Sequence, residues 1–441
     1  MIQLSDHFTY RRLLRFTLPS IIMMVFTSIY GVVDGFFVSN YVGETSFAAV
    51  NFIMPVLMIL GCIGFMFGTG GAALISKLMG EGNQKKANET FTLVVTVSTV
   101  LGALLAVLGI LFVRPLAQLL GAEGEMLESC VRYARIVSIA QPFFVLQYEF
   151  QCFFSVAEKP KLGLIVTVIA GVTNMVLDAL FVAVLPWGLA GAAAATAFSQ
   201  FVGGAVPLAY FLFRNKTRLR FGRFHFDGRA LFKTCSNGVS EFMSNISSSL
   251  VGMLYNAQLL KYAGQSGISA YGVLMYVNFA FLSIFIGYSV GTAPIIGYHF
   301  GAKNHDELKS LLRKSFQMVA IGAAAMFAAA WLLARPLASM FVGYNKDLMT
   351  LTLRAFHFFS FSFLFAGFSI FGSAFFTALN DGLTSALISF LRTLVFQASA
   401  VLVFPILWEL DGIWLSIVGA EFMAVTATVI FLIAKRRKFG Y

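Results

Sequence analysis

Long apolar stretches alternate with short polar segments along the whole chain. A helix needs roughly 20 mainly apolar residues to cross the hydrocarbon core of a bilayer, and twelve stretches meet this requirement. They lie at residues 16–39, 47–76, 91–113, 129–157, 162–185, 188–213, 234–260, 267–298, 315–334, 351–379, 383–406 and 412–434. Because irregular backbone cannot face lipid, this pattern predicts an all-α polytopic membrane protein with twelve transmembrane helices. The first stretch is too long for the apolar region of a signal peptide and is interpreted as a span.

The composition supports this interpretation and argues against other classes of protein. Hydrophobic residues make up 59% of the chain and charged residues 12%, whereas soluble domains carry about 25% charged residues. The net charge of +11 is assigned to loops facing an anionic leaflet and not to nucleic-acid binding. The four cysteines are scattered, and neither HExxH nor GxSxG occurs. We therefore expect no zinc site, no disulfide framework and no intramembrane enzyme.

Basic residues are concentrated in alternate loops. With the N-terminus inside, the cytoplasmic segments hold 23 of the 31 lysines and arginines, and the external loops hold four. The excess of Lys and Arg marks the cytoplasmic side. The sequence therefore predicts a multi-pass protein of the cell (inner) membrane with both termini in the cytoplasm.

The second half of the chain repeats the first half in one ungapped register. Gly70 falls on Gly291, Gly80 on Gly301, and the run Arg-Pro-Leu-Ala at 114–117 on the same run at 335–338. Six spans per unit give a parallel repeat, with an N-lobe at 1–213, a basic cytoplasmic linker at 214–233 and a C-lobe at 234–441. Two facing lobes suit a transporter with a site between them, whereas a channel more often uses several identical subunits.

Acidic residues inside spans are costly and are candidates for function. Asp34 lies in span 1 on a stripe with Ser20, Thr27 and Gly31. Asn174 and Asp178 share one face of span 5 because they are four residues apart. Facing aspartates would form either a proton site or, with the oxygen of Asn174, a sodium site, and the residues do not decide between them.

The C-lobe carries its own polar stripe in span 7. It contains Glu241, Asn245, Ser248, Gly252 and Tyr255, so that Tyr255 occupies the repeat position of Asp34. We expect this stripe, together with Arg392, to contribute to a substrate site or polar site of the C-lobe. Arg392 is alternatively the ion-pair partner of Glu421, because buried charges are usually paired. Glu149 and Glu241 lie toward the cytoplasmic ends of their spans and either act in transport or extend to the interface.

Two further patterns have a packing interpretation beside a functional one. The GxxxG pairs at Gly64/Gly68 and Gly287/Gly291 are expected to bring helices close together. Span 10 is rich in phenylalanine between Phe356 and Phe376. These rings either line a cavity for flat or cationic molecules or fill the surface toward lipid.

Several local segments resemble the MATE family of multidrug and toxic compound extrusion transporters, prokaryotic type. They are Tyr-Gly-Val-Val-Asp at 30–34, Gly-Gly-Ala-Ala-Leu-Ile-Ser-Lys at 70–77, Asn-Met-Val-Leu-Asp at 174–178, Gly-Leu-Ala-Gly-Ala-Ala at 188–193 and Ala-Pro-Ile-Ile-Gly-Tyr-His-Phe-Gly-Ala-Lys at 293–303. The resemblance covers nearly the whole chain and implies cation-coupled export by alternating access.

The resemblance also implies a cation-coupling site in the N-lobe. Family members use an Asp on helix 1, an Asn on helix 4, an Asn and an Asp on helix 5 and a Thr on helix 6. The matching positions here are Asp34, Asn174, Asp178 and Thr196, with Gln151 at the helix 4 position. The coupling ion is H⁺ or Na⁺, with Na⁺ assigned to Asp34, Asn174 and Asp178. Gln151 keeps the amide but has a longer side chain, which puts Na⁺ selectivity in doubt.

The functional expectation is antiport of an amphipathic organic, often cationic, small molecule. Its partners are that substrate and membrane lipid, without nucleic acid or a cofactor, and the protein is expected to be a monomer. The alternative within the same superfamily is a flippase for a lipid-linked oligosaccharide. Such flippases line their cleft with cationic residues, and apart from Arg392 this chain has little deep positive charge.

Overall fold

The computed structural model describes residues 2–42, 44–213, 217–343 and 345–441, and these residues form helices and connecting turns without a β-strand. The helices are α1 (Tyr10–Tyr41), α2 (Glu44–Gly80), α3 (Gln84–Leu119), α4 (Gly124–Ile139), α5 (Gln141–Val156), α6 (Pro160–Asp178), α7 (Gly188–Leu212), α8 (Gly228–Gly301), α9 (His305–Val342), α10 (Lys346–Ser360), α11 (Phe363–Ala378), α12 (Gly382–Phe390) and α13 (Gln397–Phe439). Two π-helical segments, η1 (Ala179–Val184) and η2 (Leu391–Phe396), follow α6 and α12.

All twelve expected spans are helical, although breaks and fusions change how the helices divide. By length and composition, eight helices in the described part of the chain suffice to cross a membrane, or nine if α10 and α11 count as one span bent by 49°. Span 4 is not among the eight, because it is divided into α4 and α5 and its arginines lower its mean hydropathy. Spans 7 and 8 are joined in α8 across Gly264 (φ 60°), and spans 11 and 12 are joined across Glu409 (φ 49°). The prediction of an all-α polytopic fold is confirmed.

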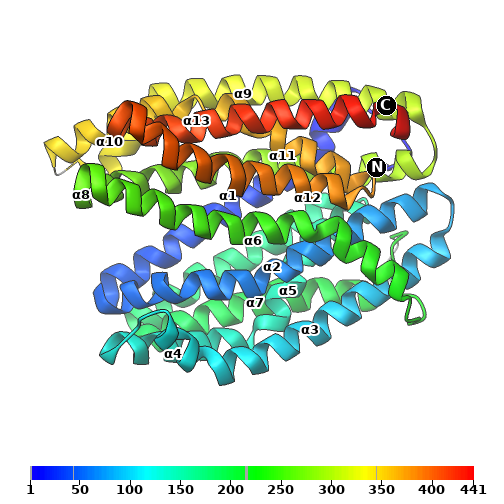
Figure 1. The fold of residues 1–441 in the computed structure, drawn as a ribbon. Coiled ribbons are helices and arrows are strands. Elements are labelled where there is room, and N and C mark those ends of the chain that lie inside the picture. Colours follow the sequence, from blue (N-terminus) through cyan, green and yellow to red (C-terminus); the bar gives the residue numbers. More distant parts are fainter. Residues whose placement is uncertain (1, 43, 214–216, 344) are drawn as a thin grey trace.

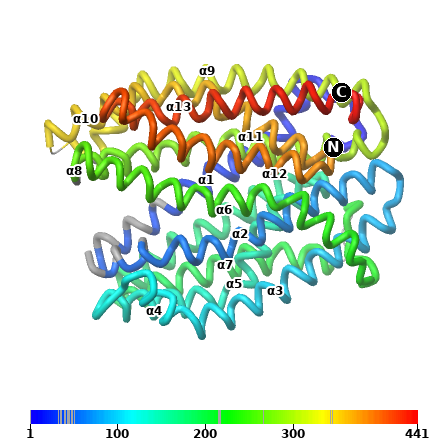
Figure 2. Tube along the Cα trace, in the orientation of Figure 1, coloured from blue at the N-terminus to red at the C-terminus, as the bar shows by residue number. Residues whose placement is uncertain are grey.

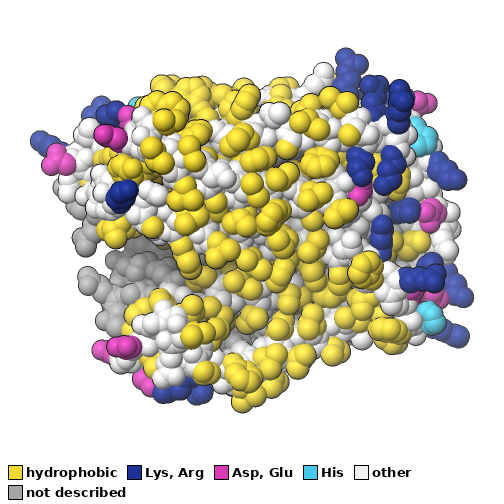
Figure 3. Space-filling view, in the orientation of Figure 1, with side chains coloured by type: hydrophobic (Ala, Val, Ile, Leu, Met, Phe, Trp, Pro, Cys, Tyr) yellow, Lys and Arg dark blue, Asp and Glu magenta, His cyan; other side chains and the backbone are white. Residues whose placement is uncertain are grey.

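The two halves of the chain form two layers. Helices α2 to α7 form the lower layer in Figure 1, and α9 to α13 form the upper layer. Figure 2 shows the same division by colour, with the cyan helices in one layer and the yellow to red helices in the other, while α1 (blue) runs from the N-terminus in the upper layer to the lower layer. The N- and C-termini lie at the same end of the bundle, where Lys and Arg side chains gather in Figure 3.

The repeat is visible in how equivalent helices begin. Asn83 caps α3 by accepting a hydrogen bond from the backbone N–H of Lys86 at 3.1 Å. Asn304, its counterpart in the second repeat unit, caps α9 by accepting from the N–H of Glu307 at 3.1 Å. The same residue type thus satisfies one of the free N–H groups at the start of the third helix of each lobe.

The segment between the lobes is shorter than the predicted linker 214–233. Asp227 accepts hydrogen bonds from the N–H groups of Arg229 and Ala230 at 3.0 and 3.1 Å. An aspartate in this position is a strong N-cap, and α8 therefore begins at Gly228. The end of the predicted linker, from Gly228 onward, belongs to the helix.

The lobes are in close backbone contact at the end that carries the basic residues. A Cβ atom added to Gly80 would lie 2.0 Å from the carbonyl oxygen of Tyr298, and one added to Gly301 would lie 2.0 Å from that of Lys77. Each contact is the equivalent of the other under the internal repeat. Two backbones this close leave no space for a side chain, so these glycines close the space between the lobes at this end.

The GxxxG pairs pack helices as predicted. Gly64 and Gly68 of α2 lie against the backbone of Val145 and Glu149 in α5. Gly287 and Gly291 of α8 lie against the backbone of α1. The first pair acts inside one lobe, whereas the second joins the two halves of the chain.

Candidate functional site

Two buried aspartates lie together in the N-lobe. Asp34 of α1 is 8% exposed and Asp178 at the end of α6 is fully buried. Each is the principal charged neighbour of the other, and Asp34 also lies against Thr196 of α7. Helices α1, α6 and α7 therefore bring Asp34, Asp178 and Thr196 to one place. We call these residues, together with Asn174 one turn before Asp178, the N-lobe cluster.

The backbone changes geometry at this cluster. The α-helix α6 ends at Asp178, and the π-helical segment η1 follows directly. Short π-helical stretches widen a helix locally and often occur at functional sites. The equivalent helix of the C-lobe contains η2, which includes Arg392. Both lobes thus have a π-helical segment beside or around a buried charged residue.

The oxygens of the N-lobe cluster are free to bind a cation or protons. Asp34 Oδ1, both carboxylate oxygens of Asp178, Thr196 Oγ1 and Asn174 Oδ1 have no well-formed hydrogen bond to any described residue. Buried polar atoms without a partner are rare, and carboxylate, amide and hydroxyl oxygens are ligands of small hard cations. The donor set therefore fits Na⁺ as well as protons.

The structure adds two tyrosines that the sequence analysis did not select. Tyr133 of α4 is fully buried, and it lies against Thr196 and close to both aspartates. Tyr30, one turn before Asp34 on α1, lies between that carboxyl and Gln147 of α5. Helical spacing places Tyr133 on the same buried face of α4 as Cys130 and Val137, and this is the signal that could have identified it.

Gln151 and Asn174 occupy less central positions. Gln151 is 4% exposed and lines a small void with Gln147 and Thr167. Its amide has no hydrogen-bond partner among the described residues. The α5 amide that the structure places beside the tyrosine and aspartate group is Gln147, one turn earlier. Asn174 is 2% exposed and lies one turn before Asp178 on α6.

A cavity of about 480 Å³ lies between the lobes. Residues of α1, α2 and α5 form one wall, and residues of α8, α11, η2 and α13 form the other. Apolar side chains such as Met58, Phe65, Met275 and Phe279 line much of it. Such a volume suits one drug-sized organic molecule.

Three charged side chains face this cavity. Arg392 binds Glu421 through Nη2 at 2.8 Å and through Nε at 3.0 and 2.9 Å to the two carboxylate oxygens. The expected ion pair is therefore present, and it leaves the third charged group, Glu241 of α8, facing the same space. With all three ionised, the cavity carries one net negative charge.

The other expected C-lobe residues separate into two groups. Asn245 lines the cavity one turn after Glu241, together with Ser248 and Gly252. Tyr255 lies outside the cavity wall, where its hydroxyl bonds Ser416 at 2.8 Å. Its ring stacks on Tyr271, which does line the cavity.

The phenylalanines of span 10 do not form the cavity wall. Apart from Ile370, this span presents small residues to the cavity, namely Ser362, Ala366, Ser369, Ser373, Ala374 and Thr377. Phe356, Phe363, Phe371 and Phe375 are instead nearly fully buried in helix packing. A ring-lined cavity is therefore wrong for this span, and these buried rings do not fill the surface toward lipid either.

One helix connects the N-lobe cluster with the cavity. Met24 and Thr27 of α1 line the cavity, and Asp34 lies two turns further along the same helix. A displacement of α1 caused by binding at Asp34 would therefore change the cavity wall directly.

The MatE family model matches this chain twice, over residues 19–180 and 242–403. The chain belongs to the MatE family. One match lies in each lobe, and the two cover corresponding parts of the internal repeat. Members of this family are transporters and not enzymes.

Known proteins similar to this MatE protein carry related names. The multidrug export protein MepA of Staphylococcus haemolyticus is 27% identical over 325 residues, which cover 72% of this chain and 70% of that protein. MepA of Staphylococcus saprophyticus is 22% identical over 443 residues, which cover 97% and 94%. A solved outward-facing structure of a multidrug resistance MATE family transporter has the same fold, with a TM-score of 0.93, 21% identity and coverage of 98% and 97%.

Proposed function

We propose that this MatE protein is a secondary active exporter that exchanges amphipathic organic, often cationic, compounds for H⁺ or Na⁺. The single observation that carries the proposal is that acidic side chains lie at two separate sites, the N-lobe cluster and the central cavity, and that α1 reaches both. Asp34 and Asp178 lie buried in the N-lobe, whereas Glu241 faces the cavity beside the internally paired Arg392 and Glu421. The names of the related MepA proteins agree with export of several compounds.

The cavity chemistry favours a cationic, partly apolar substrate. Glu241 and the amide of Asn245 provide polar contacts on α8, and methionine and aromatic side chains provide apolar contacts around them. Low dielectric strengthens the attraction between a buried carboxylate and an organic cation. A flippase for an anionic lipid-linked sugar would need excess positive charge here, and the pairing of Arg392 with Glu421 removes it.

The transport cycle follows from the position of α1. In the outward-facing state, H⁺ or Na⁺ binds Asp34 and Asp178 from outside and neutralises them. The position of α1 then changes, the cavity wall at Met24 and Thr27 rearranges, and the substrate is released outward. The ion-loaded lobes then return to the inward-facing state, where the ion is released and the cavity opens to the cytoplasm for the next substrate. The ion drives this cycle only by binding the two states with different affinity.

The proposed location is the inner membrane of the cell, with both termini in the cytoplasm and the protein acting as a monomer. The gathering of basic side chains at the end that carries both termini supports this orientation. Membrane lipid surrounds the helices and is the proposed partner of the protein besides its substrate. No cofactor takes part in the proposed cycle.

Efflux from proteoliposomes tests the proposal directly. A fluorescent organic cation is loaded, and a pH gradient or a Na⁺ gradient is imposed on wild-type protein and on Asp34→Asn. We expect one gradient to drive efflux by the wild type, and the variant, which folds normally, to lose the gradient-dependent part. Full activity of Asp34→Asn would contradict coupling at this residue. Failure of every dye under both gradients would contradict the substrate class and favour lipid-linked substrates.

A further inference from the structure

The segment that joins the two lobes lies along α3. The N–H of Arg220 donates to Asn88 Oδ1 at 3.1 Å, and the N–H of Gly222 donates to Thr92 Oγ1 at 2.8 Å. Thr92 lies just over two turns into α3, which is roughly 12 Å from the helix start at about 1.5 Å per residue. Because α3 enters the membrane from this end, the linker descends to the depth of the lipid headgroups.

Side chains after Gly222 point in two directions. Phe224 and Phe226 are 55% and 64% exposed, whereas His225 and Asp227 face α3 and line a pocket. Such alternation is expected of extended backbone, and Asp227 itself is extended (φ −118°, ψ 97°). Exposed phenylalanine rings are costly in water, and Phe is among the side chains that interfacial segments bury at the boundary of headgroups and acyl chains. The outer side of this segment therefore suits lipid, and its inner side forms part of a polar site.

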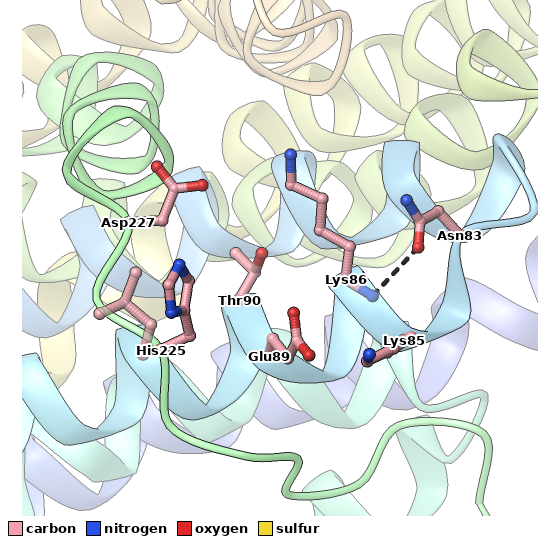
Figure 4. Close-up of a pocket in the computed structure, with 8 residues that line it drawn as sticks. Asn83, Lys85, Lys86, Glu89, Thr90, His225 and Asp227 are labelled. Atoms are coloured by element: carbon pink, nitrogen blue, oxygen red, sulfur yellow. Dashed lines mark hydrogen bonds between the residues drawn. The ribbon is translucent and has the colours of Figure 1, made fainter.

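The pocket has a volume of about 360 Å³ and contains charges of both signs. It is lined by Asn83, Lys85, Lys86, Glu89, Thr90, Leu93, His225 and Asp227. Figure 4 shows the α3 side chains, among them Lys86, Glu89 and Thr90, across from His225 and Asp227 of the linker. This pocket is separate from the N-lobe cluster and from the central cavity, with which it shares no residue.

Asp227 remains ionised in this pocket. A hydrogen bond from the N–H of Ala230, opposed by partial desolvation and assisted by the charges of Lys86 and His225, holds the pKa of Asp227 below its ordinary value. The carboxylate of Asp227 is therefore fixed beside two basic groups. A ligand with only negative charge would be attracted by the lysines and repelled by Asp227 and Glu89.

We propose that this pocket binds the headgroup of a membrane phospholipid that carries both a phosphate and a primary ammonium group. The phosphate lies near Lys85, Lys86 and His225, because lysine ammonium groups and an imidazole N–H donate hydrogen bonds to phosphate oxygens. The ammonium group lies near the carboxylates of Glu89 and Asp227. The acyl chains leave the pocket toward the membrane.

The aromatic residues identify the source of the phosphate. A soluble phosphate compound from the cytosol would bind through the charged side chains of the pocket alone and would gain nothing from exposed aromatic rings. A lipid also gains from Phe224 and Phe226, whose exposed rings lie next to the pocket at the level of the interface. The ligand is therefore a lipid of the ethanolamine type and not a soluble phosphate ester.

Lipid retention by the purified full-length protein tests this site. The protein is mixed with equal amounts of phosphatidylethanolamine, phosphatidylcholine and phosphatidylglycerol, and bound lipid is counted by native mass spectrometry. We expect phosphatidylethanolamine to be preferred, because choline has no N–H donor and glycerol has no positive charge. Equal retention of the three lipids, or a preference for phosphatidylglycerol, would overturn the proposal.

Variants locate the lipid. Lys86→Gln and Glu89→Gln should each lower phosphatidylethanolamine retention by about tenfold, as expected for the loss of one charged hydrogen-bond partner. Lys309→Gln and Asp306→Asn change exposed charges at the start of α9 and serve as matched controls. Thermal unfolding confirms that each variant is folded. Retention that falls equally in variants and controls would overturn the assignment to this pocket.

The last comparison separates a lipid from a soluble phosphate. Glycerophosphoethanolamine, which has the headgroup without acyl chains, is added as a competitor, and Phe224→Ser/Phe226→Ser is tested for retention. We expect weak competition and reduced retention by the double variant. Strong competition together with unchanged retention would overturn the lipid assignment in favour of a soluble ligand.

Discussion

At the scale of single residues, Tyr133 places a neutral hydroxyl beside the two aspartates of the N-lobe cluster. That hydroxyl has no hydrogen bond to a described residue, although the side chain is fully buried. A bound Na⁺ or a protonated carboxyl would supply its partner. We expect Tyr133→Phe to change stability by less than about 1 kcal/mol and to weaken the apparent affinity for the coupling ion several-fold.

The dependence of efflux on ion concentration measures this effect. Tyr255→Phe is the matched control, because it removes a buried tyrosine hydroxyl from the C-lobe, where Ser416 is the partner. Unchanged ion dependence in Tyr133→Phe, or the same change in Tyr255→Phe, would contradict a role for Tyr133 in the N-lobe cluster.

The pair formed by Arg392 and Glu421 gives a second prediction at this scale. Glu421 is nearly fully buried, and Arg392 supplies its positive partner. Arg392→Met leaves an uncompensated buried carboxylate, which should destabilise the protein by about 3–5 kcal/mol. The double variant Arg392→Met/Glu421→Leu removes both charges and should recover most of this loss.

Thermal unfolding of the single and double variants in detergent measures the sign and the size of the interaction free energy between Arg392 and Glu421. A double variant as unstable as Arg392→Met would show that volume and packing, and not the unpaired charge, determine the loss.

At the scale of helices, the contact between α2 and α8 sets how closely the lobes approach at the basic end. Gly80→Ala places a Cβ against the carbonyl of Tyr298, at 2.0 Å in the present geometry. Backbone cannot yield to this extent, so the helices must separate. We expect the variant to favour the state that is open at this end and to reduce transport, with the helices themselves intact.

Spin labels at exposed Glu81 and Asp306, in a background without cysteine, would report this separation as a longer distance. Gly272→Ala is the control, because nothing lies within 4 Å of its added Cβ. An unchanged distance distribution in Gly80→Ala would contradict the role assigned to this contact.

At the scale of the whole molecule, the gathering of basic side chains at one end predicts the orientation in the membrane. We expect green fluorescent protein fused to either terminus to fluoresce, and alkaline phosphatase fused to either terminus to be inactive, since that enzyme folds only outside the cytoplasm. Active phosphatase at one terminus would contradict the even number of spans.

The sequence predicted the spans and the repeat because apolar length and residue identity can be read directly along the chain. It did not predict where spans divide, although Pro142 at the start of α5 is a local signal for the break between α4 and α5. The aspartates of the N-lobe cluster were evident because charge inside a span is costly. Tyr133 and the serine-rich cavity face of α11 were missed, since their importance depends on which neighbours a helix face meets.

The reciprocal contacts of Gly80 with Tyr298 and of Gly301 with Lys77 have the geometry of an isologous interface, in which two identical subunits use the same patch. Here both patches belong to one polypeptide, so the two repeat units pack against each other as the two subunits of a homodimer would. A true homodimer would carry the same acid on both sides of its axis. Fusion removes that constraint, so that position 34 is an aspartate while its counterpart 255 is a tyrosine. Each half is thereby free to carry different side chains at equivalent positions, while the shared seam between them stays matched.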